Sequence, residues 1–313
     1  MIYTLTLNPA VDKEHTVPHL VMDEVLRAAS TRVDHGGKGF NVSRMLKVLG
    51  TSSTSVGLVG GHNGALLRDG LESAGIRTDF VQLNGETRTN VSIVDKALAH
   101  YIKVNETGPM VSAGEIASLM TKIESRLKPD DWWVLAGSLP PGIPDDIYAR
   151  IIHIIQEGGA RVVLDSSGEP LRLGCQAGPY LAKPNACEAS QITGKPVETV
   201  EEMALITPEL LAMGIRVVVI SAGKKGALIS DGKQQWFGHA PVIEEHNPVG
   251  AGDAMVAGMV WRLAQGEEPS TALRWGLACG AAAASQPGTG MASKAIIESL
   301  FPKTILELMN NAI

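Results

Sequence analysis

Cysteine is scarce in this sequence. The chain has three cysteines in 313 residues, and this odd number without CxxC spacing argues against a disulfide framework. We interpret Cys175, Cys187 and Cys279 as reduced thiols that serve packing rather than chemistry.

Clusters of basic residues and long apolar runs are also missing. The chain carries 27 Lys and Arg against 33 Asp and Glu, a net charge of −6, with no block of cations. Nucleic-acid binding needs clustered cations, so no nucleic-acid partner is expected, although a local cationic pocket fits this balance. No apolar stretch reaches membrane-spanning length, and the N-terminal MIYTLTLNPAVDKEH lacks a basic n-region and a cleavage site. We therefore expect a cytoplasmic protein without a membrane partner.

Two common nucleotide-binding motifs are absent. The nearest approach to a Walker A loop, Gly194-Lys195, is followed by Pro196 instead of Ser or Thr. Three glycine-rich stretches begin like the dinucleotide fingerprint GxGxxG, but each lacks the third glycine. These absences weaken the alternative of an NAD-dependent oxidoreductase.

The sequence does contain an alternation of β-rich runs and helical patterns. The β-rich runs cover residues 2–7, 54–60, 131–137, 160–166 and 216–223. The helical patterns cover residues 41–50, 64–75, 112–127, 144–159 and 207–214. Near-continuous apolar strands between helices are typical of a doubly wound α/β fold with a mostly parallel sheet. We therefore predict a single α/β domain over residues 1–313, with ligands bound beyond the carboxyl ends of its strands.

Two stretches break this alternation. Residues 11–34 show no clear helical stripe, and residues 79–105 give three strand-like pieces, DFVQL, TRTNVSIVD and ALAHYIKVN. Together they predict a small antiparallel β-sheet beside the main domain, a lid formed approximately by residues 11–34 and 85–106. After residue 250 the chain is expected to be mostly helical, including a small-residue helix at 272–285.

The most informative motif is VGAGD at residues 249–253, directly before an apolar, helix-like run. Small residues at a helix start let backbone N–H groups approach an anion, and the helix dipole adds positive potential. Asp253 at this place could accept the proton of an incoming hydroxyl group. The alternative is an ordinary turn in which Asp253 only caps the helix.

A second glycine-rich helix entry is HGGKGFN at residues 35–41. Gly36, Gly37 and Gly39 would admit a polar ligand next to the backbone, with Lys38 and Asn41 supplying charge and hydrogen bonds. The alternative is a flexible loop with a solvated lysine.

Two further stretches fit the phosphates of a nucleotide. KPNACE places Asn185 and Glu188 three residues apart at a helix start, where their oxygens could bind Mg²⁺ or could form a capping pattern. SAGKKGA, at residues 221–227, is a strand followed by a glycine loop, which suits phosphates and equally suits an ordinary hairpin.

Isolated charged residues complete the candidates. Asp12, just after the first strand, could bind a polyol. Arg27, Lys38 and Arg88 could bind a phosphate on the acceptor, or could be surface charges, an alternative favoured for Arg27.

Taken together, these stretches resemble the ribokinase-like (PfkB) family of sugar kinases. GGKGFNVSRMLKVLG is similar to the N-terminal signature of that family, and NPVGAGDAMVAGM to its C-terminal one. YTLTLNPAVD, GETRTNVSIVD, LAGSLPPGIP, VVLDSSGEPLR and YLAKPN resemble its 1-phosphofructokinase and tagatose-6-phosphate kinase branch. The resemblance implies a doubly wound α/β fold with a β-sheet lid, often shared in a homodimer.

The resemblance also implies a role for each candidate residue. Asp253 matches the catalytic base, and Gly250, Ala251 and Gly252 match the anion hole. The positions that match acceptor-sugar binding, including its phosphate, are Asp12, Arg27, Gly36, Gly37, Lys38, Asn41, Arg88 and Ser138. The positions that match nucleotide binding are Lys183, Asn185, Ser221, Gly223, Gly226, Asn247 and Val249, and those that match Mg²⁺ binding are Asn185 and Glu188.

The expected activity is therefore transfer of a phosphoryl group from ATP, with Mg²⁺, to a hexose monophosphate. Fructose 1-phosphate is the first choice of acceptor, because the TRTN and SLPPG contexts resemble 1-phosphofructokinases. Asn247-Pro248 resembles the tagatose-6-phosphate branch instead, so tagatose 6-phosphate and fructose 6-phosphate remain alternatives. A catalytically silent sensor of nucleotides or sugar phosphates is the alternative outside the kinases.

Overall fold

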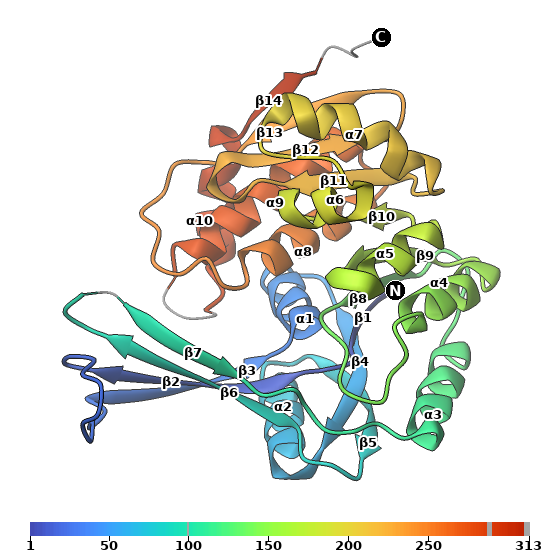
Figure 1. Ribbon diagram of the computed structural model, residues 1–313. Coiled ribbons are helices and arrows are strands. Elements are labelled where there is room, and N and C mark those ends of the chain that lie inside the picture. Colours follow the sequence, from blue (N-terminus) through green and yellow to red (C-terminus); the bar gives the residue numbers. More distant parts are fainter. Residues whose placement is uncertain (99, 287–289, 310–313) are drawn as a thin grey trace.

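The computed structural model describes residues 1–98, 100–286 and 290–309, and it contains two β-sheets (Figure 1). From edge to edge, the ten strands of the main sheet are β14 (Ile305–Leu308), β13 (Gln235–His239), β12 (Gly226–Ser230), β11 (Val217–Ser221), β10 (Leu181–Ala182), β9 (Arg161–Asp165), β8 (Trp132–Ala136), β1 (Ile2–Thr6), β4 (Ser53–Gly60) and β5 (Arg77–Leu83). In this spatial order, all neighbouring strands from β11 through β1 to the edge strand β5 pair in parallel. Strands β12, β13 and β14 extend the sheet in antiparallel fashion.

Helices cover both faces of this sheet. The apolar cluster on one face includes α1 (Lys38–Val48), α8 (Ala251–Leu263), α9 (Pro269–Ala284) and α10 (Lys294–Leu300). The cluster on the other face includes α3 (Ala113–Glu124), α4 (Ile147–Glu157), α5 (Gly168–Gln176), α6 (Ala186–Thr193) and α7 (Val200–Ala212). The inner strands β1 and β8 are buried along their whole length, as the continuous apolar runs IYTLT and WWVLA require. The expected doubly wound α/β class is confirmed.

Helix α7 differs from the sequence prediction at its start. The predicted helical pattern covers residues 207–214, with Pro208 near its start. The helix instead begins at Val200 and contains Pro208, because Met203, Ile206 and Leu210 are buried along it. Proline cannot donate to the carbonyl four residues earlier, and the side-chain amide of Gln235 reaches that oxygen, on Ala204, at 3.5 Å.

The second sheet has four strands and projects from the main domain (Figure 1). Its strand order is β3 (Ser30–Gly36), β2 (Ala10–Val17), β6 (Arg88–Asp95) and β7 (Tyr101–Asn105). The two outer pairings are antiparallel, and the central pairing of β2 with β6 is parallel. The small sheet predicted from the sequence is present, but it was predicted to be antiparallel throughout and its central pairing is parallel.

One of the three strand-like pieces was assigned to the wrong sheet. DFVQL belongs to β5, which pairs in parallel with β4 at the edge of the main sheet. Helix α2 (Gly61–Ser73) connects β4 to β5, so this piece continues the α/β alternation. A short strand shows no sign in its own residues of which sheet it will join.

The cysteines match their packing interpretation in part. Cys175 and Cys279 are buried free thiols, and burial raises the pKa of each to about 12, which keeps both protonated and unreactive. Cys187 is a free thiol too, but it is exposed. Among the described helices, none combines the length and apolar character needed to cross a membrane.

Candidate active site

The candidate residues gather where the parallel strands of the main sheet end. Helices α1 and α8 begin at the same edge, so the positive ends of two helix dipoles face these residues. The polar residues at or just beyond the strand ends are Asn8 after β1, Ser138 after β8, Asp165 at the end of β9, Lys183 after β10 and Ser221 at the end of β11.

The VGAGD motif forms the start of α8. Gly250 is the N-cap residue with φ +84°, a left-handed conformation that favours glycine, and no side chain caps this helix end. The first-turn N–H groups that follow have no carbonyl partner within the helix. A side chain at Gly252 would come within 4 Å of a single neighbour, the ammonium group of Lys183 at 3.6 Å. The N–H of Ala251 donates to the carbonyl of Pro248 at 3.1 Å, so Gly250 and Gly252 supply the amides that suit an anion next to this cation.

Asp253 lies in the first turn of α8 and is buried, with 6% of its surface exposed. Among the described residues, its one hydrogen-bond partner is Asn41, whose Nδ2 donates to Oδ2 at 2.8 Å. Its side chain therefore does not cap the helix, which excludes the alternative explanation of this residue. Burial raises the pKa of Asp253 to about 7, and the nearby negative charge of Asp165 adds to that shift while Lys38 opposes it. A carboxyl group with this pKa is suited to exchange a proton near neutral pH.

Asp165 is a residue of this site to which the sequence analysis assigned no role. Its carboxylate is buried and pairs with Lys38 at 3.2 Å and with Lys183 at 3.4 Å. Burial alone would raise the pKa of Asp165, but the two ammonium groups outweigh that effect and hold it below its usual range. Lys38 is therefore an ion-paired residue of the site and not a freely solvated loop lysine. A carboxylate directly after the apolar run ARVVL was the available signal.

Asp12 lies on β2 of the small sheet, at the base that faces the main domain. Asn90, its register partner on β6, donates to Oδ1 of Asp12 at 2.7 Å. The other carboxylate oxygen lies over Gly36, where a Cβ atom would come within 2.2 Å of it. Burial raises the pKa of Asp12. Asn90 was missed from the sequence, and its place opposite Asp12 became visible with the strand register.

Arg88 joins the small sheet to the main domain. Its guanidinium donates to the carbonyl of Glu106 at 2.8 Å and to that of Asn8 at 3.0 Å, while its buried Nε has no partner. The side-chain amide of Asn8 donates in turn to the carbonyls of Thr107 and Leu139. Ser138, the neighbour of Leu139, is exposed in the same loop. The Arg88 guanidinium keeps further N–H groups for a ligand, since it has five donors.

Arg27 does not lie with the other candidates. It is exposed in the loop between β2 and β3, beyond their last register pair, Thr16 with Ser30. Asp12 lies four residues before Thr16, which is about 13 Å along a strand. Within one chain, Arg27 is therefore separated from Asp12 and Arg88.

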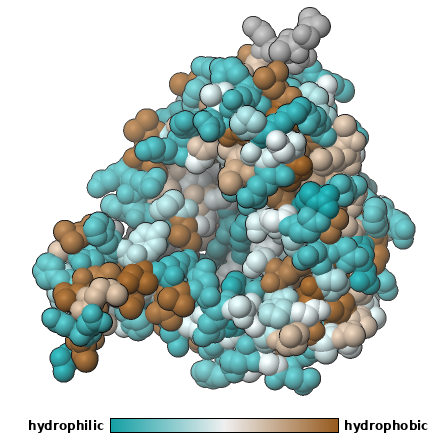
Figure 2. Space-filling model, viewed as in Figure 1, coloured by the Kyte–Doolittle hydropathy of each residue, from teal (hydrophilic) through white to brown (hydrophobic). Residues whose placement is uncertain are grey.

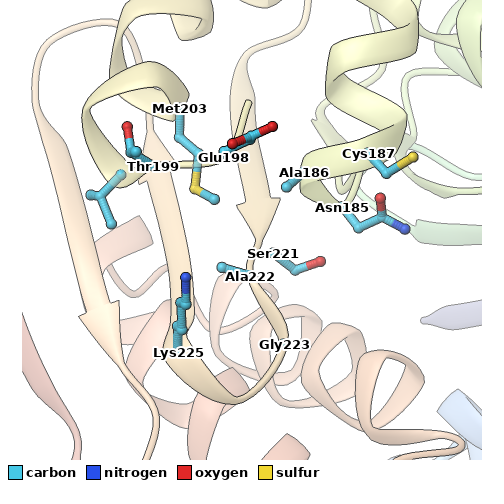
Figure 3. Close-up of a pocket in the computed structure, with 11 residues that line it drawn as sticks. Asn185, Ala186, Cys187, Glu198, Thr199, Met203, Ser221, Ala222, Gly223 and Lys225 are labelled. Atoms are coloured by element: carbon cyan, nitrogen blue, oxygen red, sulfur yellow. The ribbon is translucent and has the colours of Figure 1, made fainter. Parts of the chain in front are cut away.

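The nucleotide-binding candidates surround the end of β11. Asn185 forms a parallel bridge with Ser221, and a pocket of about 520 Å³ opens beside them. Figure 3 shows Asn185 and Cys187 on one side of this pocket, Glu198 and Thr199 on another, and Lys225 below them. Asn247 accepts a hydrogen bond from the N–H of Val249 at 2.9 Å and so shapes the approach to α8.

The two glycines of the SAGKKGA loop have different surroundings. Gly223, in the 3₁₀ turn η1 (Gly223–Lys225), has φ +59° and open space where a side chain would be. Gly226 has φ +128°, and a Cβ atom there would lie 1.8 Å from the carbonyl oxygen of Gly238 on β13. Gly226 is thus required by the close pairing of β12 with β13, and Gly223 is the glycine open to a ligand.

Asn185 and Glu188 form a capping box at the start of α6, as one of the two sequence interpretations expected. Asn185 accepts from the N–H of Glu188, and Oε2 of Glu188 accepts from the N–H of Asn185, both at 2.8 Å. Oε1 of Glu188 makes no hydrogen bond to the described residues, and its charge contributes to the raised pKa of Lys38. A hard cation with retained waters fits this oxygen donor set.

The chain is similar to known proteins over most of its length. The model of the "pfkB family carbohydrate kinase" matches residues 4–295. The chain is 33% identical over 285 residues to the 1-phosphofructokinase of Borreliella burgdorferi, with 91% of this chain and 92% of that protein covered. It is 36% identical over 260 residues to the 1-phosphofructokinase of Rhodobacter capsulatus, with 83% and 82% covered.

A solved structure agrees with these sequence relatives. Phosphofructokinase-2 from Escherichia coli in complex with potassium superposes with a TM-score of 0.92 at 29% identity. The superposition covers 96% of this chain and 98% of that one.

Proposed function

Because the chain belongs to the pfkB family of carbohydrate kinases, we propose that it is an ATP-dependent hexose-phosphate kinase that converts fructose 1-phosphate to fructose 1,6-bisphosphate. The observation that carries this proposal is the position of Asp253: a buried carboxyl group in the first turn of α8, close to the backbone amides at the helix start and influenced by the charges of Lys38 and Lys183. This is what phosphoryl transfer to an alcohol requires: a base for the hydroxyl proton and positive charge for the moving phosphoryl group.

In the proposed reaction, Asp253 accepts the proton of the sugar hydroxyl while the hydroxyl oxygen attacks the terminal phosphorus of ATP. A new O–P bond forms, and the bond from that phosphorus to ADP breaks. The N–H groups of Gly250 and Gly252 would stabilise the charge on the phosphoryl oxygens, together with Lys183, and the N–H of Ala251 would join them on leaving the carbonyl of Pro248. Lys38 and Lys183 are already held in place by Asp165, so little reorganisation is needed when the charge develops.

We assign the nucleotide to the open side of the β11 hairpin and the start of α8. Ser221 and Gly223 would contact it on the hairpin side, and Asn247 and Val249 on the α8 side. Asn185 and Glu188 would hold Mg²⁺ through its waters, since each keeps oxygen lone pairs free after the capping box is made. Held there, Mg²⁺ would supply positive charge to the phosphate oxygens.

We assign the acceptor to the base of the small sheet. The free oxygen of Asp12 over Gly36 would bind a sugar hydroxyl, and Arg88 would bind the phosphate that the sugar already carries. Gly37 and Lys38 at the start of α1 and Ser138 after β8 would border the same acceptor. Fructose 1-phosphate is preferred here because the relatives above are 1-phosphofructokinases. Tagatose 6-phosphate and fructose 6-phosphate are the alternatives.

We further propose that the small sheet is a lid and that its outer face joins a second copy in a homodimer. The sheet is amphipathic, because the residues in register with Asp12 are polar and those in register with Lys13 are largely apolar. Brown, apolar residues gather on the projecting sheet in Figure 2. Those on the apolar face are Val33, Val91, Ile93, Ile102 and Val104.

A homodimer would also account for Arg27. In one chain Arg27 is exposed at the distal end of the small sheet, so it could meet an acceptor phosphate by reaching the site of a second copy. The lid would exclude water from the reacting phosphoryl group. We place the reaction in the cytoplasm, where the free thiols of the chain would remain reduced.

The proposal is tested by measuring ADP release in steady state with each of the three sugar phosphates. We expect the highest kcat/KM with fructose 1-phosphate and little turnover with unphosphorylated fructose. A preference for tagatose 6-phosphate or fructose 6-phosphate would show that the proposed acceptor is wrong and that the protein is nevertheless a kinase. Binding of ATP and of all three sugars without turnover would contradict the kinase and favour a sensor.

A further inference from the structure

We propose that Arg44 is a positioning residue of this site, because it fixes which end of the Asn41 side-chain amide faces Asp253. The inference rests on the proposed role of Asp253 as the base. It concerns a residue that would touch neither the sugar nor the nucleotide.

The three residues form a chain of hydrogen bonds between α1 and α8. Asn41 and Arg44 are three residues apart on α1, so their side chains lie on the same side of the helix. Nη1 of Arg44 donates to Oδ1 of Asn41 at 3.4 Å, and Nδ2 of Asn41 donates to Oδ2 of Asp253 at 2.8 Å. Asn41 and Asp253 are buried, with 5% and 6% of their surfaces exposed, so water does not readily replace either partner.

The direction of this chain follows from the chemistry of its first member. A guanidinium has donors and no acceptor, whereas an amide has a donor end and an acceptor end. Arg44 can therefore face the oxygen of Asn41 and not its NH₂ group. The NH₂ group is then left for Asp253, and a donor at this place favours the ionised carboxylate.

Without Arg44 the amide is free to rotate by half a turn. The oxygen of Asn41 would then face Oδ2 of Asp253, and two acceptors can share a hydrogen bond only when the carboxyl is protonated. The rotated amide thus favours the protonated form, which cannot act as a base. The hydrogen bond from Asn41 occupies Oδ2 of Asp253, whereas Oδ1 accepts no hydrogen bond from the described residues. Oδ1 is therefore the oxygen that would accept the hydroxyl proton.

Other charged groups surround Arg44 and Asp253, the two ends of this chain of hydrogen bonds. Asp253 is influenced by Asp165 on β9, by Lys38 on α1 and by Lys183 after β10. Arg44 is influenced by Asp34 on β3, the strand that also carries His35. Burial lowers the pKa of His35, and the charge of Arg44 lowers it further, so removal of Arg44 would also change His35. The experiment must separate these two effects.

The test is the pH profile of kcat at saturating ATP and fructose 1-phosphate, between about pH 5.5 and pH 9, for Arg44→Met. We expect its acid limb to move up by about one pH unit, which lowers kcat about tenfold on that limb and leaves it near the wild-type value at pH 9. Arg44→Lys retains donors and should restore the wild-type profile. Lys47→Met, an exposed lysine on the same helix, controls for loss of a positive charge.

The contribution of His35 is removed by repeating the pair of profiles in a His35→Gln background. The shift caused by Arg44→Met should persist there. Should Arg44→Met fail to fold, Arg44→Gln is measured in its place, and a smaller shift in the same direction is expected.

A loss of kcat by the same factor at every pH would show that Arg44 only stabilises the fold, and an unchanged profile would show that it does not orient Asn41. Either result overturns the inference. Asp253→Asn separates this failure from failure of the proposed function. If Asp253→Asn loses turnover while Arg44→Met keeps the wild-type profile, the inference alone is wrong. If Asp253→Asn keeps full turnover, both the proposed role of Asp253 as the base and the inference about Arg44 are wrong.

Discussion

At the scale of single residues, the site keeps a carboxylate under conditions that disfavour its charge. Asp253 is buried close to a second buried carboxylate, Asp165, and its pKa is raised to about 7 from its usual value of 3.8. A buried ionised group destabilises the folded protein unless it is fully paired. Asp253 has one hydrogen bond from Asn41 among the described residues, so the charge is retained for chemistry rather than for stability.

We therefore predict that Asp253→Asn stabilises the protein above neutral pH. A carboxyl group whose folded pKa is raised contributes stability below its unfolded pKa, and that contribution is lost as the pH rises through about 7. The uncharged amide does not suffer this loss. Its gain at pH 8 should be on the order of 1 kcal/mol or more, which corresponds to about 2–4 °C in Tm. Thermal melts of both proteins check this, and a gain at pH 8 no larger than at pH 5 would contradict it.

At Arg88 we predict a selective loss of affinity for the sugar phosphate. A hydrogen bond to a charged group contributes about 1.5–3 kcal/mol, so Arg88→Ala should raise the KM for the sugar phosphate at least about tenfold. The KM for ATP should change little. Arg32→Ala serves as the control, because Arg32 lies on the same sheet in surface ion pairs with Glu14 and Asp34. An unchanged KM for every sugar phosphate would refute the phosphorylated acceptor.

At the scale of elements, the start of α8 carries the chemistry. A helix offers unpaired amides at its first turn wherever it begins, but here no side chain caps them. Helix α3 begins in the ordinary way, with Ser112 and Glu115 in a capping box. The start of α8 thus has no side-chain partner for its first-turn N–H groups, whereas the start of α3 has one.

The second position of each helix gives a matched test. Gly252 in α8 and Gly114 in α3 both occupy this place, and Gly114 has open space where a side chain would be. Alanine is the better helix former, so Gly252→Ala and Gly114→Ala should both fold at least as stably as the wild type. We predict that Gly252→Ala alone lowers kcat, by about tenfold or more, because the added methyl group would lie 3.6 Å from the ammonium group of Lys183, where the phosphoryl group is proposed to bind. Equal activity of the two variants would contradict the anion site.

At the scale of the whole molecule, the small sheet presents a polar face and an apolar one. Asp12 and Asn90 belong to the polar face, and Val33 and Val104 to the apolar one, where they are 43% and 61% exposed. Exposed apolar surface of this kind usually marks a binding surface. Two copies joined through it would cover both apolar faces and leave both polar faces for the acceptor.

We predict that the wild-type chain is a dimer and that Val104→Asp dissociates it. Lys103→Asp introduces the same group one residue away, on the polar face, and should leave the dimer intact. Sedimentation velocity over a range of protein concentrations distinguishes the two states. A monomeric wild type, or a dimer that both variants weaken equally, would refute this interface.

Much of the fold could be predicted from the sequence, because a buried parallel strand leaves a continuous apolar run such as WWVLA or RVVLD. DFVQL could not be assigned to its sheet, because its alternation is compatible with either sheet. The start of α7 was also missed, since Pro208 carries a local signal that burial of the helix overrides.

The site divides in the same way. Lys38, Asn41 and Asp253 stand in motifs whose glycines identify them, and the structure brings all three together. The role of Asp165 depends on an ion pair across 127 residues, and the link from Asn41 to Asp253 spans 212. Such contacts leave no pattern in the sequence near either partner. Asn90 likewise could not be identified as a partner of Asp12 before the strand register placed the two residues opposite each other.

The most direct test of Asp253 as the catalytic base is the turnover of Asp253→Asn with ATP and fructose 1-phosphate, measured beside ATP binding by calorimetry. We predict ATP binding close to that of the wild type and a kcat reduced by about two to four orders of magnitude, the usual contribution of a positioned base. ATP binding close to wild type together with full turnover would contradict it.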